Sequence, residues 1–216
     1  MGIIMVTLLA GVGIVSANLV SNPSFEFPVN TQSWQTYPDG TPTLVWHVEQ
    51  GLGAPAGIVP TLEYQTQSTL GLTPANGNQY AELDSYANVN ISQSIATTAG
   101  KVYSISFAQA CRSDGGENPS LLGVYWGNTY LGQTSCTQTK TWVTQGYSPT
   151  AATTGQTKLM FVDEGPSNSY GVLLDNVDVE EQGVVSTPEF PTIALPIALI
   201  VGMLGAVLFI QRTKEQ

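Results

Sequence analysis

Basic residues are scarce in this chain of 216 residues, which has six Lys and Arg against 16 Asp and Glu and a formal net charge of −10. A protein that neutralises nucleic-acid phosphates needs clustered Lys and Arg, so nucleic acid is excluded as a partner. Histidine occurs once, as His47. This excludes multi-histidine metal sites and leaves one candidate imidazole for a Ser-His-Asp triad, yet no serine stands in a G-x-S-x-G motif.

Helical periodicity is also missing. Charged residues make up only 10% of the chain, too few for a coiled coil, whereas the 42% of hydrophobic residues is too high for a disordered chain. Apolar and polar residues instead alternate with a period of two, as in Tyr103, Ile105 and Phe107. This alternation predicts strands at 89–95, 101–107, 121–126, 142–147, 158–162 and 172–179. Residues 18–183 are therefore expected to form one all-β domain, a β-sandwich or jelly roll.

The two ends of the chain are apolar. Residues 1–17 end in Val15-Ser16-Ala17, the small residues that a signal peptidase recognises, and predict a signal peptide. Residues 193–210 carry no charge and as a helix would extend roughly 27 Å, enough for the hydrocarbon core of a membrane. The basic residues of the 211–216 tail predict a cytoplasmic end. The expected topology is an exported domain with a single C-terminal transmembrane helix.

The linker at 184–192 contains Pro188, Glu189 and Phe190. This triplet, followed by an apolar helix and a basic end, resembles the archaeal PEF-CTERM sorting signal. The resemblance implies recognition by an archaeosortase, which would remove the tail and transfer the protein to another surface anchor. An ordinary membrane anchor is the alternative.

The chain has two cysteines, Cys111 and Cys136. In an exported protein, two cysteines most simply form a disulfide. Cys111 ends a predicted strand and Cys136 follows the next hairpin, so we expect laterally neighbouring strands to bring them together.

Five short motifs in order resemble the galactose-binding-domain-like jelly rolls, which include many carbohydrate-binding modules and a cell-wall-associated family of unknown function. They are N-L-V-S-N-P-S-F-E at 18–26, a G-to-L strand at 77–83, I-S-Q-S-I at 91–95, G-K-V-Y-S-I-S-F at 100–107 and L-D-N-V-D-V at 174–179. The resemblance implies that the first and last strands are adjacent. It also implies a structural calcium ion held by Glu26 and Asp175, with backbone carbonyls completing an oxygen shell.

Carbohydrate recognition requires exposed aromatic faces beside planar hydrogen-bonding groups. The candidate aromatic side chains are Trp46, Tyr86, Trp126 and Trp142. Arg112 is the candidate polar partner, because strand alternation places it on the face opposite the predicted core.

The sequence thus predicts an exported, surface-anchored, non-catalytic module that binds carbohydrate or mediates adhesion. One alternative is a structural cell-envelope protein without a small ligand. Another is a glycoside hydrolase, whose two carboxylates would come from Glu82 and Asp84 or from Asp163 and Glu164.

Overall fold

The computed structural model describes residues 17–112, 114, 120–136 and 140–183. Residues 1–16 of the predicted signal peptide, the sorting motif and the expected transmembrane helix lie outside these residues. Among the described residues, no helix is long and apolar enough to cross a membrane. The described elements are β1 (Trp34–Pro38), β2 (His47–Gln50), β3 (Thr61–Thr66), α1 (Gln67–Leu70), β4 (Gln79–Glu82), β5 (Val89–Thr97), β6 (Tyr103–Ala110), β7 (Ser120–Trp126), β8 (Thr129–Cys136), β9 (Val143–Tyr147), β10 (Gly155–Asp163) and β11 (Leu173–Glu181).

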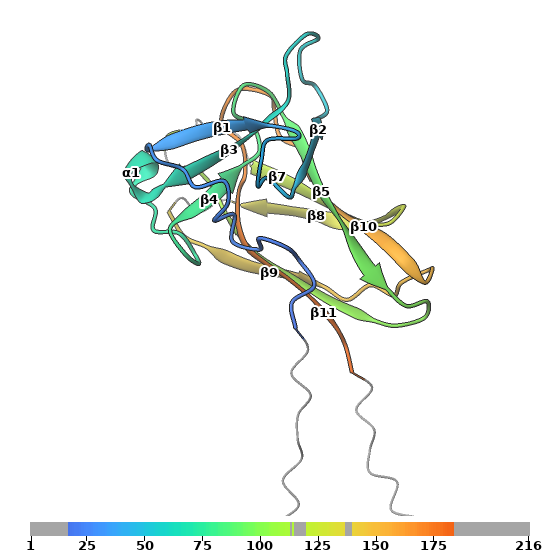
Figure 1. Cartoon of the computed structure of the whole chain (residues 1–216). Coiled ribbons are helices and arrows are strands. Elements are labelled where there is room, and N and C mark those ends of the chain that lie inside the picture. The colour runs from blue at the N-terminus through green and yellow to red at the C-terminus, as the bar shows by residue number, and fades with distance from the viewer. Residues whose placement is uncertain (1–16, 113, 115–119, 137–139, 184–216) are drawn as a thin grey trace, which may run out of the picture. The chain divides into compact units, whose positions relative to one another are not determined.

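The strands form two antiparallel sheets (Figure 1). One sheet has six strands in the order β1-β3-β4-β11-β6-β9, and the other has five in the order β2-β5-β10-β7-β8. Neighbours in each sheet are often distant in sequence, as where β10 lies between β5 and β7. The all-β jelly-roll class predicted from the sequence is confirmed.

The predicted alternation is confirmed in the core. Tyr103, Ile105 and Phe107 of β6 are at most 1% exposed and point between the sheets. Aromatic side chains form the centre of this core, where the Phe107 and Phe161 ring centroids are 5.0 Å apart and those of Phe25 and Trp46 are 5.3 Å apart. All six strands predicted from period-two patterns are present, as β5, β6, β7, β9, β10 and β11.

The N-terminal segment runs beside the last strand. The backbone N–H of Leu19 donates to the Val179 carbonyl at 2.8 Å, and that of Val177 donates to the Pro23 carbonyl at 2.8 Å. The Asn18 side chain also donates to the Val177 carbonyl. The two ends of the described domain are thus joined, as the jelly-roll resemblance implied.

Cys111 and Cys136 form the predicted disulfide, with a Cα–Cα distance of 5.6 Å. The expected route to this pairing was wrong. Cys111 follows β6 of the six-stranded sheet, whereas Cys136 ends β8, an edge strand of the five-stranded sheet. The disulfide therefore joins the two sheets rather than lateral neighbours in one sheet, and closing this loop is worth about 3 kcal/mol.

Candidate functional site

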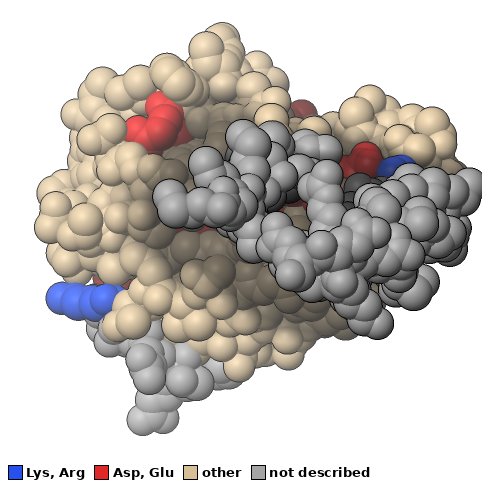
Figure 2. Space-filling model, turned by 90° about the horizontal axis from the view of Figure 1, so that it is seen from below, with Lys and Arg blue, Asp and Glu red and all other residues tan. Residues whose placement is uncertain are grey.

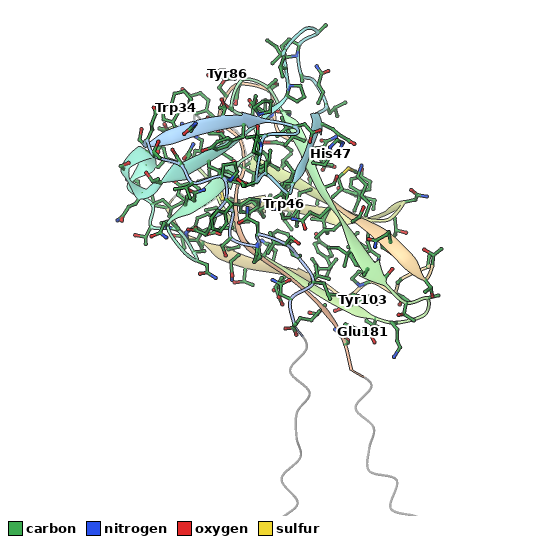
Figure 3. The ribbon with its side chains drawn as sticks, in the orientation of Figure 1. Trp34, Trp46, His47, Tyr86, Tyr103 and Glu181 are labelled. Atoms are coloured by element: carbon green, nitrogen blue, oxygen red, sulfur yellow. A yellow bond between two sulfur atoms is a disulfide. The ribbon has the colours of Figure 1, made fainter. Side chains whose placement is uncertain are left out.

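A cavity of about 250 Å³ opens on the outer face of the six-stranded sheet, at the end that carries β1 and β3. Its two aromatic members are Trp34 and Tyr86, whose residues are 44% and 56% exposed and which lie at the end of the domain opposite Glu181 (Figure 3). The complete lining is Trp34, Glu63, Thr69, Ser85, Tyr86 and Arg112. We call this cavity the Trp34–Tyr86 pocket.

Strand phase explains why Trp34 faces outward. Tyr37, three residues later in β1, is 5% exposed and packs in the core. Residues three apart in a strand point to opposite faces, so Trp34 lies on the outer face, where it is paired in register with Gln65. Sequence reasoning missed Trp34, although its phase relative to Tyr37 was a usable signal.

Two neighbouring carboxyl groups lie at the pocket, and one of them, Glu63, lines it. Glu63 of β3 and Glu82 of β4 are directly opposite each other in the antiparallel register, and their residues are 6% and 0% exposed. The Glu63 carboxylate accepts hydrogen bonds from Gln65 Nε2 at 2.7 Å and Ser85 Oγ at 2.8 Å. Burial, and then the charge of Glu63, raise the pKa of Glu82 to about 8, while the nearby Arg112 guanidinium acts in the opposite direction.

Arg112 is held in place on several sides. Its Nε and Nη2 atoms both donate to the Asp114 carboxylate at 2.9 Å, which lowers the pKa of Asp114. Its Nη1 lies 3.3 Å from Glu82 Oε1 and 3.3 Å from the Ser169 carbonyl oxygen. The guanidinium also sits over the Tyr170 ring, 5.1 Å from its centroid. These contacts fix the position of Arg112 at the edge of the pocket.

The acidic pairs considered for glycoside hydrolysis bind mainly the loop between β10 and β11. Asp84 Oδ2 accepts the backbone N–H groups of Asn168 and Ser169 at 2.7 and 2.8 Å. Asp163 accepts the backbone N–H groups of Gly165 and Val172, and Glu82 accepts that of Gly171 at 2.6 Å.

Glu164 differs from the other three acids, because it accepts hydrogen bonds from the side chains of Tyr130 and Gln133 of β8. These carboxyl groups thus position loops, including the segment that carries Tyr170.

The prediction that Trp46 and Trp126 bind a ligand is wrong. Trp46 is 1% and Trp126 is 3% exposed, so neither offers a ring face to a ligand. Trp46 lies inside the domain (Figure 3), where it is stacked on Phe25. Trp126 packs against Tyr103. Trp142 packs against Tyr80 and donates its Nε1 hydrogen to the Thr73 carbonyl at 2.8 Å. Of the predicted set, Tyr86 and Arg112 line the pocket.

A larger polar cavity of about 500 Å³ lies over β2, β5 and β10, and its described lining contains no Trp, Tyr or Phe. His47 is at its edge. The two ring nitrogens of His47 lie 2.8 Å from Asp39 and 3.1 Å from Glu49, so this imidazole pairs with carboxylates at the surface. Without an aromatic face, this cavity is the weaker candidate for sugar binding.

Glu26 and Asp175, the predicted calcium ligands, meet at the turn before β4. Glu26 accepts the backbone N–H groups of Asn78 and Gln79 at 2.8 and 3.2 Å, and Asp175 accepts that of Asn76 at 2.9 Å. Burial raises the pKa of Asp175 to about 7, and the nearby Glu26 charge adds to this rise. Their oxygen chemistry suits a hard cation. Within the described residues, no group of three or more His, Cys, Asp or Glu side chains forms a metal cluster.

Comparison with solved structures identifies the fold as that of jelly-roll carbohydrate-binding modules. The structure is similar to TmCBM61, solved in complex with β-1,4-galactotriose, at 16% identity and a TM-score of 0.51, covering 77% of this chain and all of that one. A family 4 carbohydrate-binding module is similar at 19% identity and a TM-score of 0.43, covering 75% of this chain and 99% of that one. At 16% identity, the similarity to TmCBM61 establishes the fold alone.

The C-terminal end has its own match. Residues 187–213 match the PEF-CTERM archaeal protein sorting domain, which confirms the resemblance at Pro188, Glu189 and Phe190. A domain of this type indicates export and anchoring at the cell surface. No curated protein matches the chain.

Proposed function

We propose that this protein is an exported, surface-anchored, non-catalytic module that binds carbohydrate in the Trp34–Tyr86 pocket. The observation that carries the proposal is the pair of exposed aromatic side chains beside Glu63, Ser85 and Arg112. Aromatic faces stack on the apolar face of a sugar ring, while carboxylate and hydroxyl groups bond to its hydroxyls. The jelly-roll fold and the sorting domain agree with this function.

The size of the pocket supports a short ligand. Its volume of about 250 Å³ is below the roughly 300–1,000 Å³ of pockets that enclose drug-sized molecules. One sugar ring, at a chain end or on a side branch, suits this space better than an internal run of a polysaccharide.

Glycan-array screening of the full chain in detergent tests this proposal. Binding should be lost in Trp34→Ala and Tyr86→Ala. The matched control is Tyr130→Ala, which removes an aromatic residue of 46% exposure from β8 of the other sheet and should leave binding unchanged. Failure of the wild-type chain to bind any glycan, or equal loss in the control, would reject the proposal.

The sorting domain supports a two-step route to the surface, in which residues 1–17 direct export and the tail is then removed by an archaeosortase. Mature envelope protein should then lack residues 193–216. Mass spectrometry of the C-terminal peptide tests this step. Full recovery of the peptide from mature protein would instead indicate a plain transmembrane anchor at 193–210 with a cytoplasmic tail at 211–216.

A calcium ion between Glu26 and Asp175 is the second part of the proposal. These carboxyl groups come from opposite ends of the domain and bind one turn. The calcium ion would add positive charge where burial and the Glu26 carboxylate disfavour the ionised form of Asp175. It would stabilise the junction of the chain ends without taking part in sugar contacts.

The alternative function, a structural envelope protein without a small ligand, is favoured by one observation. The loop 51–60 between β2 and β3 contains no charged residue, and its Leu52 and Val59 are 77% and 65% exposed. Exposed apolar patches often mark protein contacts. Normal glycan binding combined with loss of envelope assembly in Leu52→Ser would assign this loop a separate structural role.

A further inference from the structure

Glu63 gives the Trp34–Tyr86 pocket an acidic floor. Its two hydrogen-bond donors, Gln65 Nε2 and Ser85 Oγ, are both neutral. Within the described residues, no Lys, Arg or His forms an ion pair with it. Since Glu63 itself lines the cavity, its negative charge faces the space where a ligand would lie.

Arg112 does not offset this charge toward the ligand. A guanidinium recognises carboxylates and sulfates through paired N–H groups, but the Nε and Nη2 atoms of Arg112 already bind both oxygens of Asp114 at 2.9 Å. Its Nη1 faces Glu82 and the Ser169 carbonyl, and one ring face is covered by Tyr170. The cation that sequence reasoning proposed as a ligand contact is thus occupied by the protein's own groups.

We infer that the pocket selects sugars by charge, preferring a residue with a protonated amine over a neutral residue and rejecting uronic acids and sulfated sugars. This inference rests on the proposed carbohydrate-binding function. An amino sugar can stack on Trp34 or Tyr86 while its ammonium group donates to the Glu63 carboxylate. An acidic sugar would bring a second negative charge to Glu63, and the described lining residues offer no unpaired cation to receive it.

The surroundings of the pocket reinforce this preference. Asp114 carries a negative charge beside Arg112, and the chain as a whole has a net charge of −10. Long-range attraction to a cationic ligand is common to the whole surface, whereas the pairing with Glu63 is local. Figure 2 shows a different face, the molecule seen from below, where single acidic and basic side chains are scattered among uncharged residues in the part that the grey atoms leave visible.

The test compares sugars that differ in charge but share a ring. The full chain in detergent is titrated with methyl glycosides of glucosamine and galactosamine, their N-acetylated forms, and the corresponding uronic acids. A pH of about 6 keeps the amines protonated while carboxylates stay ionised. Calorimetry should give amino sugars at least tenfold tighter binding than the uronic acids, with the N-acetylated sugars between them.

Glu63→Gln should bring the affinities for amino and neutral sugars to within about twofold while retaining binding. Glu49→Gln is the matched control, because it removes one acidic charge at the other sheet, where Glu49 pairs with Lys158 and His47. The control should keep the wild-type preference. Equal loss of preference in both variants would mean that overall charge, and not Glu63, selects the ligand, and would overturn the inference.

Salt provides a second measurement on the unmodified chain if Glu63→Gln fails to fold. Raising the ionic strength should weaken binding of the amino sugars and leave the N-acetylated sugars unaffected. Equal or tighter binding of the uronic acids overturns charge selection but leaves carbohydrate binding intact. If sugars of every charge fail to bind, both here and on the array, the proposed function itself is rejected.

Discussion

Two clusters of carboxyl groups invite comparison. In the terminal cluster, Glu26 and Asp175 accept backbone N–H groups from one turn, and no Lys or Arg of the described residues pairs with them. In the pocket cluster, Glu82 faces Arg112 across 3.3 Å. Each cluster contains a fully buried acid of the six-stranded sheet, Asp175 or Glu82, but among the described residues only the second contains its own cation.

This difference separates two ways of keeping a buried acid. The pocket cluster is compensated within the chain, so its geometry is available without any bound ion. The terminal cluster has hydrogen bonds but no opposite charge among the described residues, and burial raises the pKa of Asp175 to about 7. We expect the first cluster to respond to mutation of its cation and the second to respond to added calcium.

The largest effect should follow Arg112→Ala, which removes the internal cation. The variant removes the ion-pair partner of Asp114 and of the buried Glu82, and it removes the donor to the Ser169 carbonyl. We expect the free energy of unfolding to fall by about 3 kcal/mol in urea denaturation. Lys101→Ala, which breaks only the exposed pair with Glu181, should cost less than about 1 kcal/mol. Similar costs for the two variants would show that Arg112 is not a structural cation.

Calcium should affect only the terminal cluster. A ligand that binds the folded state alone stabilises it by about 2.7 kcal/mol at a hundredfold excess over Kd. Millimolar calcium should therefore raise Tm by several degrees, and Asp175→Ala should abolish this rise. Asp114→Asn in the pocket cluster should retain it. Identical calorimetric melting curves in calcium and in chelator would rule out the site.

The pH dependence of the free energy of unfolding should reflect both clusters. Burial raises the pKa of Glu82 to about 8 and that of Asp175 to about 7, above the values of unfolded carboxyl groups. The folded state then holds extra protons, so stability is greatest below the unfolded pKa and is lost as pH rises through 7 to 8. We expect the free energy of unfolding to fall by a few kcal/mol between about pH 5 and pH 8. Asp175→Asn and added calcium should each flatten this profile, and a stability that rises over this range would contradict the assignment.

The smallest effect is expected at the edge of the pocket cluster. Tyr170→Leu removes the ring that covers the Arg112 guanidinium at 5.1 Å. The loss should be about 0.5–1 kcal/mol, because Tyr170 is 42% exposed. Tyr170→Phe keeps the ring and should match the wild type in chemical denaturation; a cost as large as that of Tyr170→Leu would assign the effect to the hydroxyl.

The sequence was sufficient for features that depend on local pattern. Alternation located β5 and β6, and the cysteine count predicted the disulfide, because period and composition are local properties. The pocket depends on which strands pair and in which register, and Glu63 and Glu82 become neighbours only through the β3–β4 ladder. Trp46 and Trp34 are both tryptophans near short strands, and only the three-dimensional packing buries the first and exposes the second.

The joining of the chain ends bears on how the domain carries mechanical load. The C-terminal segment leaves from β11, which lies between β4 and β6 inside the six-stranded sheet (Figure 1). Near its end β11 is flanked by β6 on one side and by residues 18–23 on the other. A pull along β11 from the anchored end loads these hydrogen bonds in parallel, so the ladder must shear as a unit instead of opening one bond at a time. A cell-surface protein that holds a tethered ligand would resist detachment forces at this strand.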